Sequence, residues 1–300
     1  MKILITDGMS PEGIDLLKQS GHEVVEQFIP QEELPEKIKG YDAIIVRSAT
    51  KVPREVIEAS NLKAIGRAGV GTDNIDKVAA KEHNIPVLNT PAASSISVAE
   101  LALGHIFALS RFIHVGKEKM KGNGWPKKEF SKGTELTGKT IGIMGIGNIG
   151  TELAKRAKGL GMNVIATDIE KTSHEYAEIV EEEKLYKDSD IISVHVPAKK
   201  DGSAYISGAE LGNMKDGVMI VNCARGGCID EAELLNALNS GKVRGAGIDV
   251  FETEPISESQ KDLVEHPNTS VSPHIGGSTV EAQDRVGIEI AERIIESLKN

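Results

Sequence analysis

Three residues with complementary chemistry follow three consecutive apolar runs in the C-terminal half of the chain. Arg225 follows the first run, Glu254 lies shortly after the second, and His274 follows the third. A planar guanidinium binds a carboxylate through two parallel hydrogen bonds, and an imidazole exchanges protons near neutral pH. A carboxylate beside that imidazole is expected to stabilise its protonated form and fix its tautomer. Together these groups could hold a 2-hydroxy acid or 2-keto acid and accept its hydroxyl proton while hydride leaves.

Each of these residues also has a plainer interpretation. Arg225 could form a salt bridge at a helix end, His274 could be structural, and Glu254, which precedes a proline, could simply begin a turn. Ligands of open α/β sheets bind beyond the carboxyl ends of the strands, so the shared position favours one site. The proline before His274 and the two glycines after it indicate a tight loop close to a ligand.

A glycine pattern in the middle of the chain has the spacing of a dinucleotide-binding turn. Gly145 would allow a tight turn, Gly147 would let a pyrophosphate approach the backbone, and Gly150 would let the next helix pack on the strand. This pattern can arise by chance, and a turn that binds no ligand is the alternative. The context favours a ligand, because an apolar strand precedes the pattern, an amphipathic helix follows it, and Asp168 ends the next strand. A carboxylate there can accept both ribose hydroxyls and repels a 2′-phosphate, which predicts NAD rather than NADP.

Alternating apolar runs and helical segments predict the elements that would position these residues. Strands that alternate with helices form parallel sheets covered on both faces. In the first part of the chain we expect five strands, at residues 3–5, 23–25, 43–46, 62–65 and 86–88. From residue 140 onward we expect the six strands of a Rossmann-type sheet, at residues 140–144, 163–167, 191–194, 217–221, 245–248 and 269–271.

The predicted fold class is α/β, with two doubly wound parallel-sheet domains. Ser97-x-x-Glu100 is a capping box that would begin a long helix to about Met120, and Ser278-x-x-Glu281 would begin the last helix. We expect that last helix to return to the first domain. The expected division is a flavodoxin-like substrate domain of residues 1–94 with 279–300, and a Rossmann NAD-binding domain of residues 95–278, with the active site in a cleft between them.

Composition narrows the class of protein further. The 300 residues are 27% charged and 39% hydrophobic, as in ordinary globular proteins. The densest apolar stretch, Val98–Leu109, is shorter than the roughly 20 residues a bilayer requires and contains Glu100 and His105. A formal net charge of −10 argues against a nucleic-acid partner. Cys223 and Cys228 have neither the number nor the spacing of a zinc site or disulfide framework, so no metal and a cytoplasmic location are expected.

The ordered motifs resemble those of the D-isomer-specific 2-hydroxyacid dehydrogenases over nearly the whole chain. They are Gly145-x-Gly147-x-x-Gly150, Asp168, Asn222-Cys-Ala-Arg-Gly-Gly227, Asp249-Val-Phe-x-x-Glu254-Pro and Pro273-His274. The resemblance implies an NAD-dependent dehydrogenase in which Arg225, Glu254 and His274 form the catalytic set. It also implies a homodimer formed through the long helix at about residues 97–120.

Further residues are expected near the cofactor. Asp249 is placed to contact the nicotinamide amide or its ribose, and the backbone at Cys223 would approach the nicotinamide. His195 could line the adenine pocket or be structural. Besides the three glycines of the turn and Asp168, the expected cofactor-binding residues are Asn148, Ile149, His195, Val196, Pro197, Cys223, Ala224, Asp249, Gly276 and Gly277.

Within the family, the phosphoglycerate dehydrogenases show the nearest likeness, in residues 46–52, 66–76, 89–91 and 222–227. The resemblance implies that loops in the first domain hold the substrate carboxylate. A C3 phosphate would add two negative charges, and Arg47, Lys51 and Arg67 lie at or near predicted strand ends. The expected substrate-binding residues are Arg47, Ser48, Lys51, Arg67, Gly69, Val70, Arg225 and His274.

The expected reaction is NAD-dependent oxidation of D-3-phosphoglycerate to 3-phosphohydroxypyruvate, the entry to serine biosynthesis. The alternatives are a glyoxylate or hydroxypyruvate reductase, another D-2-hydroxyacid dehydrogenase and, more remotely, an NAD-sensing scaffold like the C-terminal-binding-protein corepressors. Lys127 and Lys128 follow Trp125 in a loop that approaches the neighbouring subunit's site in relatives, or are surface charges. Many phosphoglycerate dehydrogenases carry a C-terminal serine-sensing ACT domain. Since this chain ends at Asn300, serine feedback through such a domain is not expected.

Overall fold

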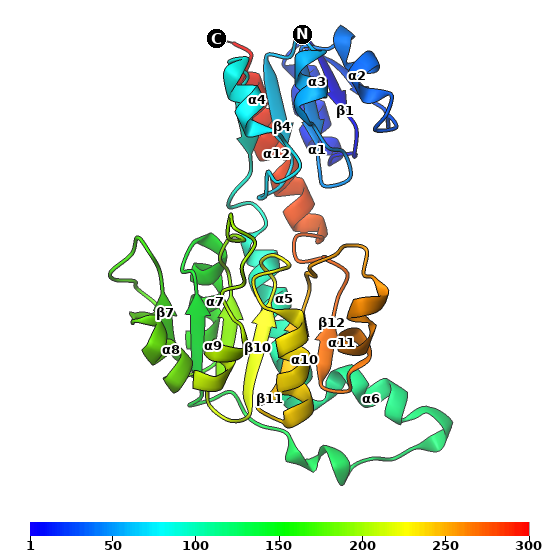
Figure 1. Ribbon diagram of the computed structural model, residues 1–300. Helices are drawn as coiled ribbons and strands as arrows, with labels where there is room; N and C mark the ends of the chain where they lie inside the picture. Colours follow the sequence, from blue (N-terminus) through cyan, green and yellow to red (C-terminus); the bar gives the residue numbers. More distant parts are fainter. Residues whose placement is uncertain (300) are drawn as a thin grey trace. The chain divides into compact units, whose positions relative to one another are not determined.

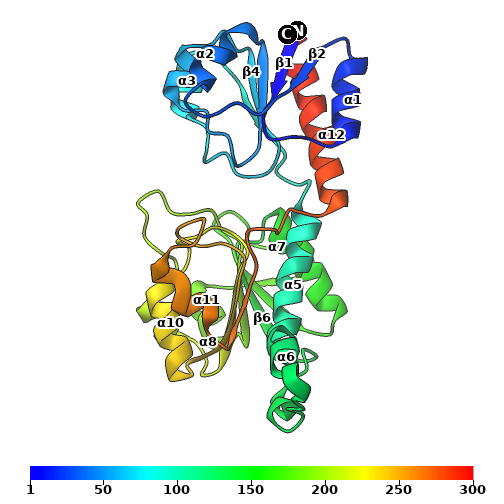
Figure 2. The same cartoon turned by 90° about the vertical axis from the view of Figure 1, so that its right-hand side faces the viewer.

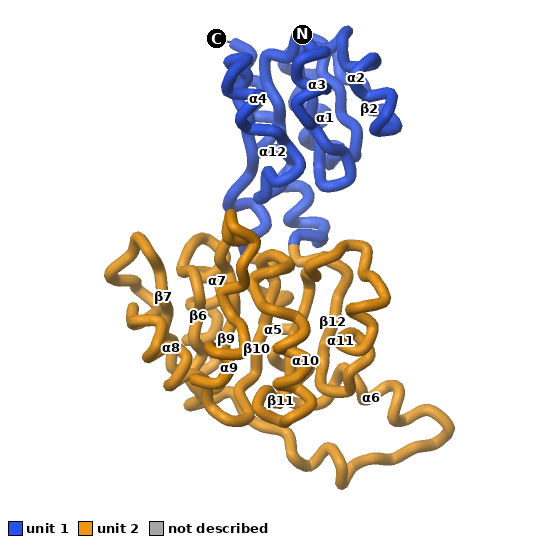
Figure 3. The backbone as a smooth tube through the Cα atoms, in the orientation of Figure 1, with its two compact units in different colours: residues 1–95, 277–300 blue, residues 96–276 orange. Residues whose placement is uncertain are grey.

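Two separate parallel β-sheets organise the chain, one in each of two compact units (Figure 3). The computed structural model describes residues 1–299, so Asn300, the last residue of the expected first domain, lies outside the described part. The first unit comprises residues 1–95 with 277–300, and the second comprises residues 96–276.

The sheet of the first unit has five strands in the order β2-β1-β3-β4-β5, which is the flavodoxin-like order. Its strands are β1 (Lys2–Ile5), β2 (Glu23–Glu26), β3 (Ala43–Val46), β4 (Ala64–Arg67) and β5 (Val87–Asn89). Helices α1 (Pro11–Gln19) and α12 (Val280–Ser297) cover one face, and α2 (Leu34–Lys37), η1 (Ile38–Gly40), α3 (Arg54–Glu58) and α4 (Lys77–Glu82) cover the other (Figures 1 and 2). Ser10 caps α1, because its hydroxyl accepts the N–H of Gly13.

The second unit has seven parallel strands in the order β12-β11-β10-β9-β6-β7-β8. These are β6 (Thr140–Met144), β7 (Asn163–Thr167), β8 (Glu178–Ile179), β9 (Ile191–Val194), β10 (Val218–Asn222), β11 (Val243–Ile248) and β12 (Thr269–Val271). The order reverses between β6 and β9, the switch point at which doubly wound sheets bind ligands.

Helices cover both faces of this second sheet (Figure 2). One face carries α5 (Ser95–Arg111) and α7 (Asn148–Gly159), and the other carries α8 (Glu182–Asp188), α9 (Gly208–Asn213), α10 (Glu231–Ser240) and α11 (Lys261–Glu265). The remaining elements are α6 (Ile113–Lys119) and three short 3-10 helices, η2 (Lys121–Asn123), η3 (Glu129–Lys132) and η4 (Glu258–Gln260). The predicted α/β class with two parallel sheets is therefore confirmed.

Four details of the sequence interpretation are wrong. The second sheet has a seventh strand, β8, which is too short to produce an alternating pattern. The helix expected at residues 97–120 ends at Arg111, because Phe112 adopts a left-handed conformation with φ 58°. Ser97 lies inside α5, where its hydroxyl donates to the carbonyl of Gly276 at 2.6 Å. The last helix is capped by Thr279 rather than Ser278.

Among the described residues, no single helix has the length and apolar character needed to cross a membrane. Only α5 and α6 taken together satisfy that criterion, and they are bent by 54° at their junction.

Candidate active site

The glycine turn lies between β6 and α7, at the switch point of the second sheet. Gly145 has φ 87°, and a Cβ there would lie 2.6 Å from the carbonyl oxygen of His195. A Cβ on Gly150 would lie 2.2 Å from the carbonyl oxygen of Gly145. A Cβ on Gly147 would have no atom within 4 Å, and no side chain caps the N-terminus of α7. Gly145 and Gly150 are thus required by packing, whereas the space at Gly147 fits the approach of a ligand.

Asp168 follows β7 and lies beside this turn. Its carboxylate accepts the N–H groups of Ile146 at 3.0 Å, Glu170 at 2.9 Å and Lys171 at 3.1 Å. Burial acts to raise the pKa of Asp168, but these three N–H groups together outweigh it and lower the pKa. The carboxylate is therefore an anion at neutral pH, as the choice of NAD over NADP requires.

The loop after β9 packs on the glycine turn from the other side of the switch point. His195 Nε2 lies 2.9 Å from the hydroxyl of Ser193, whereas its Nδ1 is buried without a hydrogen-bond partner among residues 1–299. Burial lowers the pKa of His195 to about 4, so the imidazole is neutral at physiological pH. Val196 would be 2.9 Å from a Cβ on Gly145, and Pro197 is exposed.

The turn that follows β10 is organised by the side chain of Asn222. Its Nδ2 donates to the carbonyl of Arg225 at 3.0 Å, and its Oδ1 accepts the N–H of Ala224 at 3.1 Å. Arg225 Nη1 donates to the carbonyl of Ala224 at 2.7 Å. A Cβ on Gly226 would lie 1.9 Å from the carbonyl oxygen of Phe251, so this turn packs directly on the loop after β11.

Glu254 and His274 come together from the loops after β11 and β12. Glu254 Oε2 lies 2.6 Å from His274 Nδ1, and the two side chains are 37% and 49% exposed. The carboxylate accepts a hydrogen bond from Nδ1–H, so in the neutral imidazole the other ring nitrogen, Nε2, carries no proton and can act as an acceptor. His274 has φ 52°, a left-handed conformation that is uncommon outside glycine and clusters at functional sites.

Asp249 holds the loop that carries His274. Its carboxylate, 1% exposed, accepts the hydroxyl of Ser272 at 2.5 Å and the N–H groups of Ile275 at 2.9 Å and Gly276 at 2.8 Å. Its backbone carbonyl accepts the N–H of His274 at 2.8 Å. The expected contact of Asp249 with the nicotinamide stays a prediction, whereas its anchoring of this loop was not foreseen.

His105 of α5 continues this network. Its Nε2 lies 3.0 Å from the Ser272 hydroxyl and its Nδ1 lies 2.9 Å from the Ser270 hydroxyl. Since Ser272 donates to Asp249, it must accept from His105, so Nε2 carries the proton and Nδ1 accepts from Ser270. Burial lowers the pKa of His105 more than the nearby Asp249 raises it, which favours this neutral form.

Cys223 is 6% exposed and lies in the same turn as Ala224. Burial, followed by the charge of Asp249, raises the pKa of Cys223, so it is a protonated thiol and not a nucleophile. Among residues 1–299, no group of three or more His, Cys, Asp or Glu side chains could hold a metal ion.

The expected substrate cations of the first unit lie near its own switch point, between β1 and β3. Asp7 follows β1, and its carboxylate accepts the N–H of Arg47 at 2.7 Å, the N–H of Thr50 at 3.0 Å and the Thr50 hydroxyl at 2.5 Å. Asn74 Nδ2 donates to the carbonyls of Arg47 at 2.7 Å and Thr50 at 2.6 Å. The Gln31 amide bonds both backbone groups of Lys51, each at 3.0 Å.

The second expected substrate loop follows β4. Gly69 has φ 145°, a backbone conformation that residues with a Cβ rarely adopt, and the end of the Arg67 side chain lies over its Cα. Its carbonyl accepts the N–H of Thr90 at 2.9 Å, and the carbonyl of Val70 accepts Asn89 Nδ2 at 2.6 Å. Ser48 and Lys51 are exposed in the first loop, whereas Arg47 and Arg67 are half-buried.

Residues 103–276 match the family model for the NAD-binding domain of D-isomer-specific 2-hydroxyacid dehydrogenases. The chain belongs to this family. It is therefore an NAD-dependent oxidoreductase, with the glycine turn and Asp168 in the domain that binds the cofactor. The expectation of an NAD-dependent enzyme of this family is confirmed.

Three known proteins illustrate the similarity. A hydroxypyruvate reductase from Thermotoga maritima is 47% identical over 99% of this chain and 98% of its own length. A D-3-phosphoglycerate dehydrogenase from Methanocaldococcus jannaschii is 46% identical over 100% of this chain, which spans only 58% of that relative. The crystal structure of a glyoxylate reductase from Paecilomyes thermophila superposes with a TM-score of 0.91, over 100% of this chain and 96% of the reductase chain, and the two sequences are 31% identical.

Several positioning residues escaped the sequence analysis. Asp7 had a usable signal, since an acid directly after a strand lies at the ligand-binding edge of a parallel sheet. Asn74, Gln31 and His105 had none, because each acts on a segment far away in sequence.

Proposed function

We propose that this dehydrogenase oxidises D-3-phosphoglycerate at C2 to 3-phosphohydroxypyruvate. Relatives of 44% and 46% identity carry the name D-3-phosphoglycerate dehydrogenase. On this proposal the product feeds serine biosynthesis, and the reaction takes place in the cytoplasm. NAD, when bound at the glycine turn, supplies the acceptor for the C2 hydride.

Three residues of the second unit perform the rest of the proposed reaction. Arg225 binds the substrate carboxylate and polarises the bond between C2 and its oxygen. Nε2 of His274 accepts the hydroxyl proton as the C2 hydride departs, so that one proton and one hydride leave together. Glu254, hydrogen-bonded to Nδ1, fixes the tautomer and stabilises the imidazolium that results.

The fixed conformation of the Arg47–Lys51 loop is the observation that carries the choice of substrate. Asp7, Asn74 and Gln31 hold the backbone at Arg47 and Lys51 on both sides. A loop whose backbone is already fixed loses less conformational entropy when its side chains bind an anion than a mobile loop does. Burial lowers the pKa of Arg47, with Asp7 opposing the shift, but a guanidinium stays charged at any physiological pH. We propose that Arg47 binds the C3 phosphate, with Lys51 and Arg67 contributing positive charge.

Hydroxypyruvate reductase is the second proposed activity. It is favoured by the Thermotoga maritima relative, which matches this chain at 47% identity over 98% of its own length. Hydroxypyruvate lacks the phosphate but has the same 2-keto acid group. Arg225 and Glu254 would therefore act in the same way, and His274 would donate the proton to the keto oxygen instead of accepting it from the hydroxyl. The two substrates differ in what Arg47, Lys51 and Arg67 contribute.

Replacement of Arg47 by alanine separates the two activities. If Arg47 binds the C3 phosphate, Arg47→Ala should lower kcat/KM for the reduction of phosphohydroxypyruvate about 100-fold and for that of glyoxylate less than about threefold, since a charge-assisted hydrogen bond contributes about 1.5–3 kcal/mol. Arg54→Ala is the matched control, because Arg54 is an exposed arginine of the same unit that pairs with Glu82. Equal losses on phosphorylated and unphosphorylated acids would contradict the assignment to Arg47.

We further propose that the protein is a homodimer formed through α5. Exposed apolar side chains occur on α5 and the segment after it, at Ile96, Phe107, Ile113, Met120 and Trp125. Surfaces of this composition are typical of protein interfaces. The molar mass in solution, measured by light scattering, distinguishes a dimer from the 32.1 kDa monomer and from a tetramer. Lys127 and Lys128 beside Trp125 would then be placed to reach the partner's site.

A further inference from the structure

The loop between β11 and η4 carries Glu254, and a pair of hydrogen-bonded side chains, Glu231 and Gln260, holds both of its ends. Glu231, the first residue of α10, accepts the N–H of Glu252 on Oε1 at 2.7 Å and the side-chain amide of Gln260 on Oε2 at 2.9 Å. The Gln260 carbonyl oxygen in turn accepts the N–H of Ser257 at 2.8 Å. The segment from residue 252 to residue 257 is therefore held at its start by the Glu231 carboxylate and at its end by the Gln260 amide, and these two groups bond each other.

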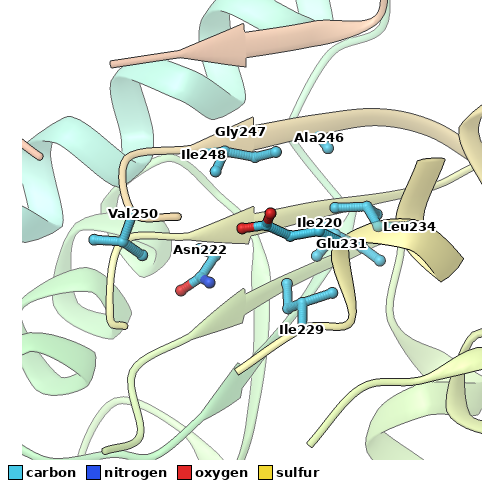
Figure 4. A pocket seen from close by; sticks show the side chains of 9 residues that line it. All are labelled: Ile220, Asn222, Ile229, Glu231, Leu234, Ala246, Gly247, Ile248 and Val250. Atoms are coloured by element: carbon cyan, nitrogen blue, oxygen red, sulfur yellow. The ribbon is translucent and has the colours of Figure 1, made fainter. Parts of the chain in front are cut away.

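The environment of Glu231 indicates that this carboxylate is not part of an ordinary surface ion pair. Gln260 is 4% exposed, and Glu231 is half-buried and, among the described residues, has no Lys or Arg within salt-bridge distance. In Figure 4 Glu231 and Asn222 are among the residues that line a small pocket beside β10, β11 and the start of α10. Burial raises the pKa of Glu231, the hydrogen bonds from Gln260 and from the N–H of Glu252 oppose this shift, and the charges of Glu252 and Glu254 add to it.

The position of Glu254 depends on this loop. Glu254 Oε1 accepts the N–H of Phe251 at 3.0 Å while Oε2 bonds His274. Phe251 is the neighbour of Glu252, whose N–H is held by Glu231. A shift of the backbone at residue 252 would therefore carry the Glu254 carboxylate away from the imidazole. Hydrogen bonds to a charged acceptor are short and directional, so the tie at Glu252 restricts such a shift.

We propose that Glu231 and Gln260 are positioning residues that hold the Glu254 carboxylate on Nδ1 of His274. This inference rests on the proposed roles of Glu254 and His274. In this proposal neither Glu231 nor Gln260 contacts the reacting atoms. Their effect on the reaction passes through the backbone of residues 251–257.

The hydrogen-bond pattern makes the pair testable by exchange of its two side chains. A carboxylate at position 231 offers acceptors to two N–H donors, whereas Glu231→Gln offers one acceptor and one donor. The new NH2 group then faces another donor, either the Glu252 N–H or the NH2 group of Gln260. A flip of the Gln260 amide would remove this clash but would turn the Gln260 NH2 group toward the Ser257 N–H. In the double variant E231Q/Q260E, every donor again meets an acceptor, because the carboxylate and the amide have exchanged places.

The experiment measures kcat, KM and the pH profile of kcat/KM for the wild type, E231Q, Q260E and E231Q/Q260E. The substrate is whichever of D-3-phosphoglycerate and hydroxypyruvate turns over faster, so the outcome does not depend on which activity is correct. We expect E231Q to lower kcat about tenfold and leave the KM for NAD or NADH within about twofold. We also expect the limb of the profile that reports His274 to move to lower pH, because the imidazolium loses its partner; this is the acid limb for oxidation of D-3-phosphoglycerate and the alkaline limb for reduction of hydroxypyruvate. The double variant should have a kcat at least about threefold above that of E231Q, which is half of the tenfold loss on a logarithmic scale. Its pH profile should return to the position of the wild type.

Two outcomes would overturn the proposal. Either E231Q has the kcat and pH profile of the wild type, or E231Q/Q260E is no more active than E231Q while melting at the wild-type temperature. Gln260→Leu, which leaves Glu231 in place and releases Ser257, covers the case in which E231Q does not fold; a wild-type profile for Gln260→Leu would then also contradict the inference. Glu254→Gln, measured in parallel, tests the proposed function itself. A wild-type profile for Glu254→Gln would reject the role of Glu254, whereas loss there without loss in E231Q rejects only the positioning pair.

Discussion

His274 combines features that a structural histidine rarely has together. It is half-exposed, its Nδ1 is held by Glu254 at 2.6 Å, and its backbone has φ 52°. Asp249 fixes this left-handed backbone, because its carbonyl accepts the N–H of His274 and its carboxylate accepts the Ser272 hydroxyl and the Ile275 N–H on either side. Such a residue is held in a costly conformation by its surroundings, which is common at active sites.

A first prediction concerns the proton transfer. His274→Ala should lower kcat by about 10²–10⁴ with little change in the Kd of NAD, because it removes the general base and leaves the glycine turn intact. Steady-state rates and NAD titration by calorimetry measure the two quantities. His266→Ala is the control from the same unit, since His266 lies before β12. A His274→Ala enzyme within about threefold of wild-type kcat would rule out the proposed base.

The buried His105 gives a prediction on stability. The pKa of His105 is lowered in the folded protein, so the stability it contributes is fully present above its unfolded pKa of about 6.5 and is lost as the pH falls toward the folded value. His105→Met should cost about 1–3 kcal/mol at pH 7.5, because Ser270 loses its acceptor, and less at pH 5.5. Urea unfolding at both pH values measures this difference, with the exposed His83→Met as control. Other histidines with lowered pKa are common to wild type and variant and cancel. A cost that is the same at both pH values would contradict this account.

Among the elements, the strands and long helices could be predicted from the periodicity of apolar residues, whereas features fixed by contacts between distant residues could not. The strand before Gly145 and the strands before Asp249 and His274 are apolar runs that can be identified locally. The break at Phe112 carries neither glycine nor proline, so no local signal marks it. The tie between Glu231 and Gln260 joins residues 29 apart in sequence and was equally invisible. Residue types at strand ends could thus be predicted, whereas the partners that hold them could not.

The turn between β6 and α7 gives a prediction for the element as a whole. Gly147→Ala should fold with wild-type stability, since an added Cβ meets no atom within 4 Å. It should nevertheless raise the Kd of NAD about tenfold, because the methyl group occupies the proposed approach of the pyrophosphate. Gly150→Ala is the matched comparison. Its Cβ would lie 2.2 Å from the Gly145 carbonyl oxygen, so it should lose about 1–3 kcal/mol of stability. Thermal unfolding and NAD titration test both. A Gly147→Ala protein with unchanged Kd would contradict the proposed position of the pyrophosphate.

For the whole molecule, both units place their chemistry by the same topological rule. In the second unit the switch point between β6 and β9 brings together the glycine turn and the loop at His195. In the first unit the switch point between β1 and β3 brings together Asp7 and Arg47. Both sheets, apart from β8, and Arg47, Arg225, Asp249 and His274 at their carboxyl edges could be predicted from the sequence, whereas Asp7 was missed. The sequence could not decide which acid is the substrate, because that depends on the charge and rigidity of a few loop residues rather than on the fold.

Initial rates across a panel of acids test the central proposal most directly. The panel is D-3-phosphoglycerate and D-glycerate with NAD or NADP, and phosphohydroxypyruvate, hydroxypyruvate and glyoxylate with NADH. The account predicts that D-3-phosphoglycerate with NAD has a kcat/KM at least about tenfold above that of D-glycerate, and that phosphohydroxypyruvate is likewise preferred among the keto acids. A higher kcat/KM for hydroxypyruvate or glyoxylate than for phosphohydroxypyruvate would contradict it and assign the enzyme to the reductases of the same family.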